Sequence, residues 1–233
     1  MRPRILRISP YAAADTDGIS ASSTPAAGGV QALTIGGALA SGGTVTFDTP
    51  RQVVVTTAAD ETGVKFLIKG TDAKGNYMQE AIVGVDTGTV STVKAFTVVT
   101  GIQVDGDTTG AIEVGTATII WTNWVPVSYL ASDFEVAMGF AIGSAAGSLD
   151  LDVEMTLDNI LVDQGNLAAK PRYLTEFDRI FPPHNVFTHS TMTAMAADTT
   201  GNLDFPVRAI RLKSNAVITT GPVALSIIQG GYS

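Results

Sequence analysis

Alternation of apolar and polar residues is the clearest signal along this chain. It is most regular over residues 149–156, where every second side chain is apolar. The apolar members are Leu149, Leu151, Val153 and Met155, and the polar members are Asp150, Asp152, Glu154 and Thr156. A period of two predicts a β-strand with one face in the core and a row of carboxylates on the other. Residues 134–142 alternate in the same way and predict a second strand.

The first half of the chain predicts a β-hairpin. Residues 64–69 alternate, residues 70–76 are dense in Gly, Asp and Asn, and residues 77–83 resume as a strand. Because turns of this kind need a positive φ, we expect Gly75 or Asn76 to take the left-handed backbone conformation.

Further short strands are expected along the rest of the chain, separated by Gly- and Asp-rich turns. They cover residues 95–100, 102–104, 111–114, 118–124, 205–212 and 223–228. No window has the pattern of a long amphipathic helix, although residues 174–180 are compatible with one or two helical turns. Many short strands between such turns favour sandwiches or barrels over alternating strands and helices.

The predicted fold class is therefore all-β, with two antiparallel β-sandwich-like domains preceded by an extended N-terminal arm. Pro126 interrupts strand pairing and marks the boundary between the two domains, which cover residues 43–126 and 127–233. The arm covers 1–42, where small, polar and turn-forming residues show no sustained period.

Two interpretations of the arm remain open from the sequence. In the first, the arm crosses a neighbouring subunit and its basic residues contact acidic groups there. These subunit-contact candidates are Arg2, Arg4 and Arg7. In the second, the arm folds back on its own domains and pairs residues 30–35 with a sheet edge.

Composition excludes several classes of function and partner. The 233 residues carry a formal net charge of −8, and only 15% of them are charged, against about 25% in typical soluble domains. An acidic chain without a basic stripe argues against nucleic acid as the main partner. A surface with few charges is typical of subunits that cover one another. No apolar run approaches the roughly 18 residues of a membrane-spanning helix, so we expect a soluble chain without a membrane partner.

Candidate chemistry is sparse. The chain has no cysteine, which removes thiolate nucleophiles and Zn–Cys sites. His184 and His189 lie in a Pro- and Asn-rich loop with no recognised metal-ligand spacing nearby, so ordinary packing or solvent roles are expected. The Asp150, Asp152 and Glu154 row is interpreted as a solvated or intersubunit face, with a cation contact as the alternative. A pair of glycosidase-type carboxylates stays open, but aromatic residues are only 7%. We predict no enzyme, no cofactor and no metal.

Several stretches resemble the β domains of tailed-bacteriophage virion structural proteins. The stretches are residues 46–53, 68–76, 79–80, 153–158, 205–212 and 227–231. The resemblance is to proteins of the head decoration, collar or tail accessory type. It implies a virion component made in the host cytoplasm, with no catalytic residues.

Within that resemblance, the first expectation is a capsid decoration or cement protein that binds neighbouring capsid subunits. A neck, collar or tail structural protein is the alternative, and a carbohydrate- or receptor-binding β module is the second alternative. We expect a homo-oligomer, with a trimer favoured, because closed symmetry is the default for subunits that decorate a shell.

Overall fold

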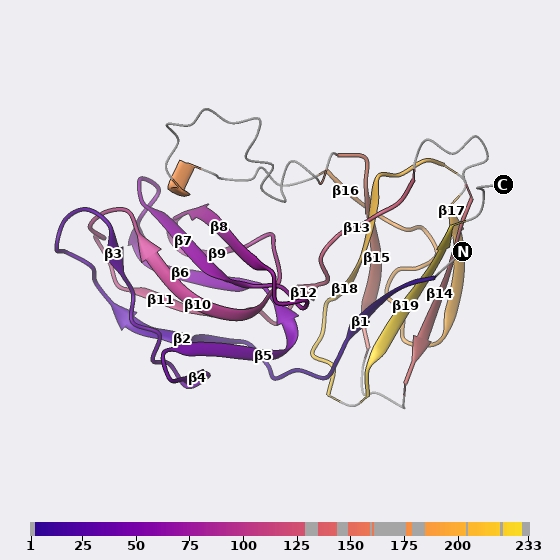
Figure 1. The fold of residues 1–233 in the computed structure, drawn as a ribbon, viewed down its shortest axis with the longest axis horizontal. Coiled ribbons are helices and arrows are strands. Elements are labelled where there is room, and N and C mark those ends of the chain that lie inside the picture. Colours follow the sequence, from indigo (N-terminus) through magenta and orange to yellow (C-terminus); the bar gives the residue numbers. More distant parts are fainter. Residues whose placement is uncertain are drawn as a thin grey trace. The chain divides into compact units, whose positions relative to one another are not determined.

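The computed structural model describes residues 3–128, 135–143, 149–158, 160, 176–178, 185–203, 205–219 and 221–229. These residues form strands and loops, with one 3-10 turn, η2 (Glu176–Asp178), and no α-helix among them (Figure 1). The predicted all-β class is confirmed. No described helix is long or apolar enough to cross a membrane.

The chain divides into two compact units, and each contains two antiparallel sheets. The first sandwich is Ala13–Ala117, joined by η2. The second sandwich contains the described residues before Ala13 and those from Thr118 onward, apart from η2. The division thus falls between Ala117 and Thr118 instead of at Pro126.

The first sandwich has one sheet in the order β4-β5-β10-β7-β8, with β3 on β10, and another in the order β2-β11-β6-β9. Its strands are β2 (Asp15–Ser23), β3 (Gln31–Ala32), β4 (Ala40–Ser41), β5 (Thr44–Arg51), β6 (Val53–Asp60), β7 (Lys65–Thr71), β8 (Tyr77–Val83), β9 (Asp86–Ser91), β10 (Phe96–Val104) and β11 (Ile112–Thr116). Phe66 and Phe96 are fully buried in the core between the sheets.

The predicted hairpin is β7 and β8, paired from Lys65↔Val83 to Thr71↔Tyr77. Gly75 has a φ of 79°, as the turn residues predicted. The Asp72 carboxylate closes the turn by accepting the backbone N–H groups of Lys74 and Asn76 at 2.8 and 2.9 Å.

The second sandwich has one sheet in the order β1-β19-β14-β17 and another in the order β12-β18-β15-β16, with β13 also on β18. Its strands are β1 (Arg4–Ile8), β12 (Ile120–Trp121), β13 (Val125–Pro126), β14 (Val136–Ile142), β15 (Leu151–Thr156), β16 (Val186–Thr188), β17 (Thr199–Leu203), β18 (Ala209–Ser214) and β19 (Val223–Gln229). The alternating residues of β14 and β15 place one apolar face of each strand in the core. Pro126 lies in β13 at the edge of its sheet, where a missing N–H is tolerated.

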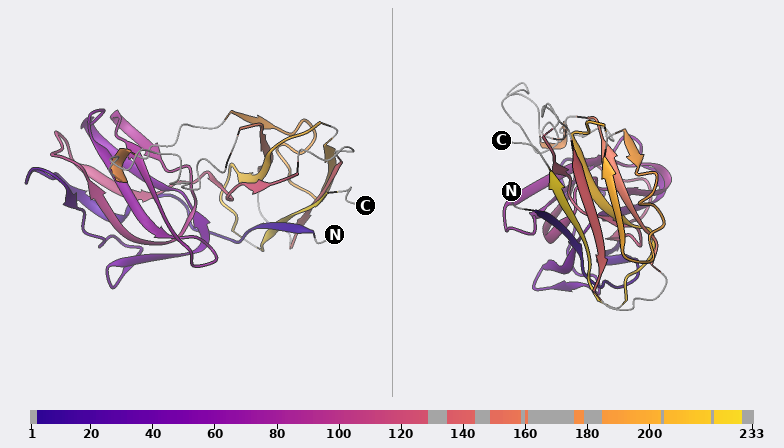
Figure 2. Two further views of the ribbon diagram at one scale, coloured as in Figure 1. Left: turned by 45° about the horizontal axis from the view of Figure 1, so that its top comes forward. Right: turned by 90° about the vertical axis from the view of Figure 1, so that its right-hand side faces the viewer.

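The extended N-terminal arm predicted for 1–42 is not confirmed, because two of its segments are strands of the sandwiches. β1 pairs with β19 from Arg4↔Ile227 to Ile8↔Val223, and Leu6 and Ile8 enter the core of the second sandwich. Figure 2 shows this indigo strand beside the yellow one. β2 pairs with β11 in the first sandwich.

The alternative interpretation of the arm agrees with the structure. β3 pairs with β10 through Gln103↔Ala32 and Val104↔Gln31, and the N–H of Leu33 donates to Ile102 O at 3.0 Å. These residues therefore fold back onto a sheet of their own sandwich.

Candidate functional site

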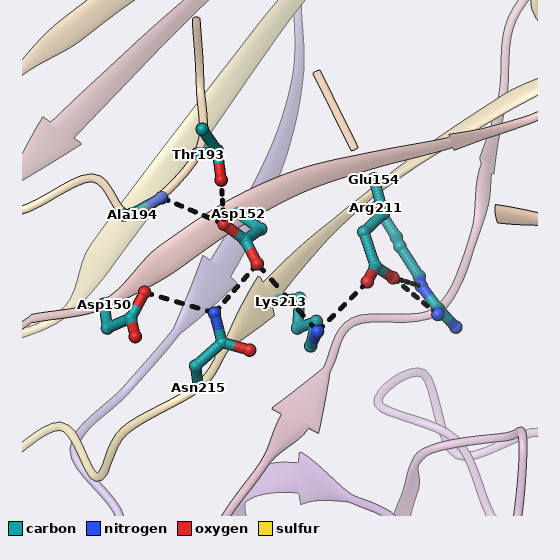
Figure 3. Close-up of polar contacts among 8 residues, drawn as sticks. All are labelled: Asp150, Asp152, Glu154, Thr193, Ala194, Arg211, Lys213 and Asn215. Atoms are coloured by element: carbon teal, nitrogen blue, oxygen red, sulfur yellow. Dashed lines mark hydrogen bonds and ion pairs between the residues drawn. The ribbon is translucent and has the colours of Figure 1, made fainter. Parts of the chain in front are cut away.

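Asp152 and Glu154 on β15 are covered by the same chain, which corrects the predicted solvated or intersubunit face at these two residues. Asp152 and Glu154 are 8% and 6% exposed. The neighbouring strand β18 places Lys213 opposite Asp152 and Arg211 opposite Glu154 (Figure 3). Alternation along β15 predicted that these acids share a face, but the basic residues opposite them come from a distant part of the sequence.

Glu154 and Arg211 form a buried ion pair. Nε of Arg211 donates to Oε2 of Glu154 at 2.7 Å, and Nζ of Lys213 lies 3.3 Å from the other carboxylate oxygen. Burial lowers the pKa of Arg211, while the charge and hydrogen bond of Glu154 oppose that shift. Because a guanidinium is effectively always protonated in proteins, Arg211 stays charged.

Two indole rings flank the guanidinium of Arg211. Its central carbon lies 4.7 Å from the ring centroid of Trp121 and 4.4 Å from that of Trp124. Both distances suit cation–π contacts. The segment that carries the indoles also bonds to β18, because the N–H of Thr122 donates to Leu212 O at 2.9 Å. The contacts of Arg211 thus add to the backbone pairing of β12 and β13 with β18.

Asp152 fixes a loop beside β15. Its Oδ1 accepts the hydroxyl of Thr193 at 2.8 Å and the N–H of Ala194 at 2.9 Å. Ala194 has a φ of 49°, a left-handed conformation that is unfavourable for a residue with a Cβ. The hydrogen bonds to Asp152 therefore stabilise a strained loop residue.

The other oxygen of Asp152 faces β18. It accepts a hydrogen bond from Nδ2 of Asn215 at 2.8 Å and lies 3.9 Å from Nζ of Lys213. Asn215 also donates to Oδ1 of Asp150 at 3.2 Å. The described residues contain no group of three or more His, Asp or Glu placed to hold a metal ion. The carboxylates of Asp150, Asp152 and Glu154 are therefore hydrogen-bonded parts of the fold.

His189 is buried, with 6% of its surface exposed, and joins two segments of the second sandwich. Its Nδ1 accepts the N–H groups of Thr191 and Met192, both at 3.2 Å. Nε2 therefore carries the hydrogen and donates to Asn202 O on β17 at 3.1 Å. His184 lies outside the described residues.

The predicted subunit-contact arginines are only partly described. Arg2 lies outside the described residues. Nη1 of Arg4 donates to Pro126 O at 2.7 Å within the second sandwich. Arg7 is exposed on the edge strand β1. Their contact with a neighbouring subunit stays a prediction.

An exposed apolar surface lies on the second sandwich, and the sequence analysis missed it. It contains Leu157, Phe187 and Phe205, which are 49%, 47% and 50% exposed, and we name these three residues the open-edge surface. All three line a hollow of about 510 Å³ that reaches the buried Met155. The lining contains no Asp, Glu, Lys or Arg. The Val-Phe-Thr sequence of β16 is typical of a strand, but it is only three residues long and irregular residues surround it, so the sequence analysis did not predict it.

Comparison with known protein families and with curated proteins finds no match for this chain.

Proposed function

We propose that this chain is a non-catalytic structural subunit of a tailed-bacteriophage virion, and within the virion a capsid decoration protein. The open-edge surface carries the proposal. Three large apolar side chains stand exposed around one hollow on a chain with few charges. Contiguous apolar surfaces of this kind are typical of protein contacts, because covering them removes apolar area from water. We infer that this surface is an assembly contact.

The chemistry of the buried polar groups supports a binding role over an enzymatic one. Asp152 and Glu154 are engaged by donors of their own chain, and His189 uses both ring nitrogens in structural hydrogen bonds. A general acid or base must instead reach a substrate proton. These groups therefore support a scaffold whose function lies on its surface.

A neck, collar or tail subunit is the second candidate, and the same surface supports it equally. A carbohydrate-binding module has less support. Sugar platforms use several exposed Trp or Tyr rings, whereas Trp121 and Trp124 both pack against the guanidinium of Arg211 and Tyr77 is the one exposed Tyr among the described residues. The open-edge surface presents Phe rings, which offer a sugar no hydroxyl or N–H group to bind.

Quantitative mass spectrometry of virions purified from the source phage tests the proposal. A decoration protein is expected in hundreds of copies for each particle, and a neck or tail ring in about 6 or 12. Hundreds of copies support decoration, and a ring number moves the protein to the neck or tail. If this chain is not found in the purified virions, the proposed structural role is wrong.

A further inference from the structure

Among the described residues, the strand β16 has a free edge. It ends the order β12-β18-β15-β16, and among the described residues it pairs only with β15. The N–H of His189 donates to Val153 O at 2.8 Å, which marks a hydrogen-bonded pair in the same register. Such pairs alternate along an antiparallel ladder, so Met155↔Phe187 is the next one. The N–H and C=O groups of Phe187 therefore face β15.

The same alternation turns the backbone groups of Val186 and Thr188 away from the sheet. Side chains alternate too, so Phe187 lies on the face of Met155, toward the hollow. β16 thus presents N–H and C=O groups to one side, at two positions placed symmetrically about Phe187.

Charge distinguishes this edge from that of β1 in the same sandwich. Proteins protect exposed edges with charged side chains, and the edge strand β1 carries the exposed Arg4 and Arg7. β16 has none, and the nearby Asp158 is turned to the N–H of Asn185 at 2.6 Å. Two copies of a chain with net charge −8 carry like net charges. Contact through β16 brings uncharged residues together and so avoids placing like charges opposite one another.

We propose that the open-edge surface binds a second copy of this chain, through antiparallel pairing of β16 with β16 about a two-fold axis at Phe187. Val186 then lies opposite Thr188 of the second copy, and each of these pairs exchanges two N–H···O bonds. The two Phe187 rings meet across the axis, where Leu157 and Phe205 extend the apolar contact. The inference rests on the proposed role of this surface as an assembly contact.

This pairing produces a dimer, whereas the sequence favoured a trimer. Both are closed assemblies, and an isologous two-fold contact needs only one self-complementary surface. An icosahedral shell has two-fold as well as three-fold positions, so a dimeric subunit remains compatible with capsid decoration.

Disulfide trapping tests the register, since the chain contains no cysteine. In the double variant Val186→Cys/Thr188→Cys, each cysteine lies opposite its partner at about 5.5 Å between Cα atoms, within disulfide range. Mild oxidation is expected to give covalent dimers. The control is Thr188→Cys alone, whose two copies would be offset to about 8 Å, beyond the range of a disulfide. Equal trapping of the single and double variants would overturn the pairing.

Sedimentation of the full chain over a concentration series provides the second measurement. The wild type is expected to dimerise, and Phe187→Lys is expected to weaken the dimer at least about tenfold because it places two ammonium groups at the axis. Tyr77→Lys is the matched control: it adds the same charge at a 64% exposed aromatic in the first sandwich and should leave the dimer unchanged. Thermal melts of dilute samples check that both variants fold.

The results separate this inference from the virion role. A wild-type monomer that is nevertheless found in virions overturns the β16 pairing and keeps the structural role. A trapped dimer that is absent from virions overturns the structural role and keeps the pairing. A dimer that Phe187→Lys does not weaken places the contact elsewhere and overturns the inference.

Discussion

Nε of Arg211 donates to Oε2 of Glu154 at 2.7 Å, and both side chains are buried on one face of the sheet formed by β15 and β18. A buried ion pair gains Coulomb energy but loses hydration, so its net contribution is small. Removing one partner is different, because it leaves a buried charge without compensation. This asymmetry makes the pair a sensitive probe of the second sandwich.

We therefore expect Glu154→Leu to lower the free energy of unfolding of the second sandwich by about 3–5 kcal/mol. The double variant Glu154→Leu/Arg211→Met should recover most of this loss, because it removes both charges. Glu176→Gln is the control: it breaks the more exposed Lys69–Glu176 pair and should cost at most about 1 kcal/mol. Urea denaturation measures all three. A double variant no more stable than the single one would contradict this account.

Asp152 predicts a defined pH dependence. Burial raises the pKa of its carboxyl, but hydrogen bonds from Asn215, Ala194 and Thr193 outweigh that effect. The charge of Lys213 acts in the same direction, so the pKa lies below its usual value. A lowered folded-state pKa contributes stability above the unfolded-state pKa of about 3.9, and that stability is lost as the pH falls through the folded-state value.

The stability difference between wild type and Asp152→Asn should therefore be constant above about pH 5 and shrink below about pH 4. Urea denaturation between pH 3 and pH 7 measures the difference. Asp150→Asn is a suitable control because Asp150 shares only Asn215 with this network. A difference that stayed constant down to pH 3 would show that Asp152 is not held in its ionised form.

Gly75 allows a test of the hairpin between β7 and β8. Its φ of 79° is strained for any residue with a Cβ, and no atom lies within 4 Å of an added Cβ. Gly75→Val should thus destabilise the first sandwich by about 1–2 kcal/mol through backbone strain alone. Gly63→Val, at an equally open position without a positive φ, should cost less. Thermal melts measure both, and equal shifts would argue against strain as the cause.

Local patterns predicted much of the fold. β15 and the β7–β8 hairpin follow from alternation, and the turn at Gly75 follows from residues that tolerate a positive φ. β2 could not be predicted in this way, since its sequence is small and polar. Its pairing with β11 depends on Gly115, where an added Cβ would lie 1.8 Å from Asp15 O. That close approach joins residues far apart in the sequence.

The site was less predictable than the fold. Alternation placed Asp152 and Glu154 on one face, but it gave no information about Arg211, which is 57 residues from Glu154 in the sequence. A strand pattern shows that a face is polar and cannot show what packs against it. For the same reason, the three residues of β16 gave no sign that Phe187 and Phe205 line one hollow.

Deletion of residues 1–12 is the test of the N-terminal strand. The deletion removes β1 from the edge of the second sandwich, together with the core residues Leu6 and Ile8 and the hydroxyl of Tyr11, which donates to Ala216 O at 2.7 Å. The first sandwich, which begins at Ala13, keeps all of its strands. The second sandwich should therefore unfold at a lower temperature, or aggregate through the exposed edge of β19, while the first sandwich is unaffected.

Calorimetry of the full chain and of the deletion variant separates the two outcomes. A selective loss of the transition that Glu154→Leu also lowers would identify the second sandwich as the unit that needs β1. Leu6→Ala within the full chain is the milder control. It should lower the free energy of unfolding of the second sandwich by about 2–5 kcal/mol, because it removes a buried side chain. If the deletion variant melts like the full chain, β1 does not complete the sandwich of its own chain, and residues 1–12 are free to contact another subunit.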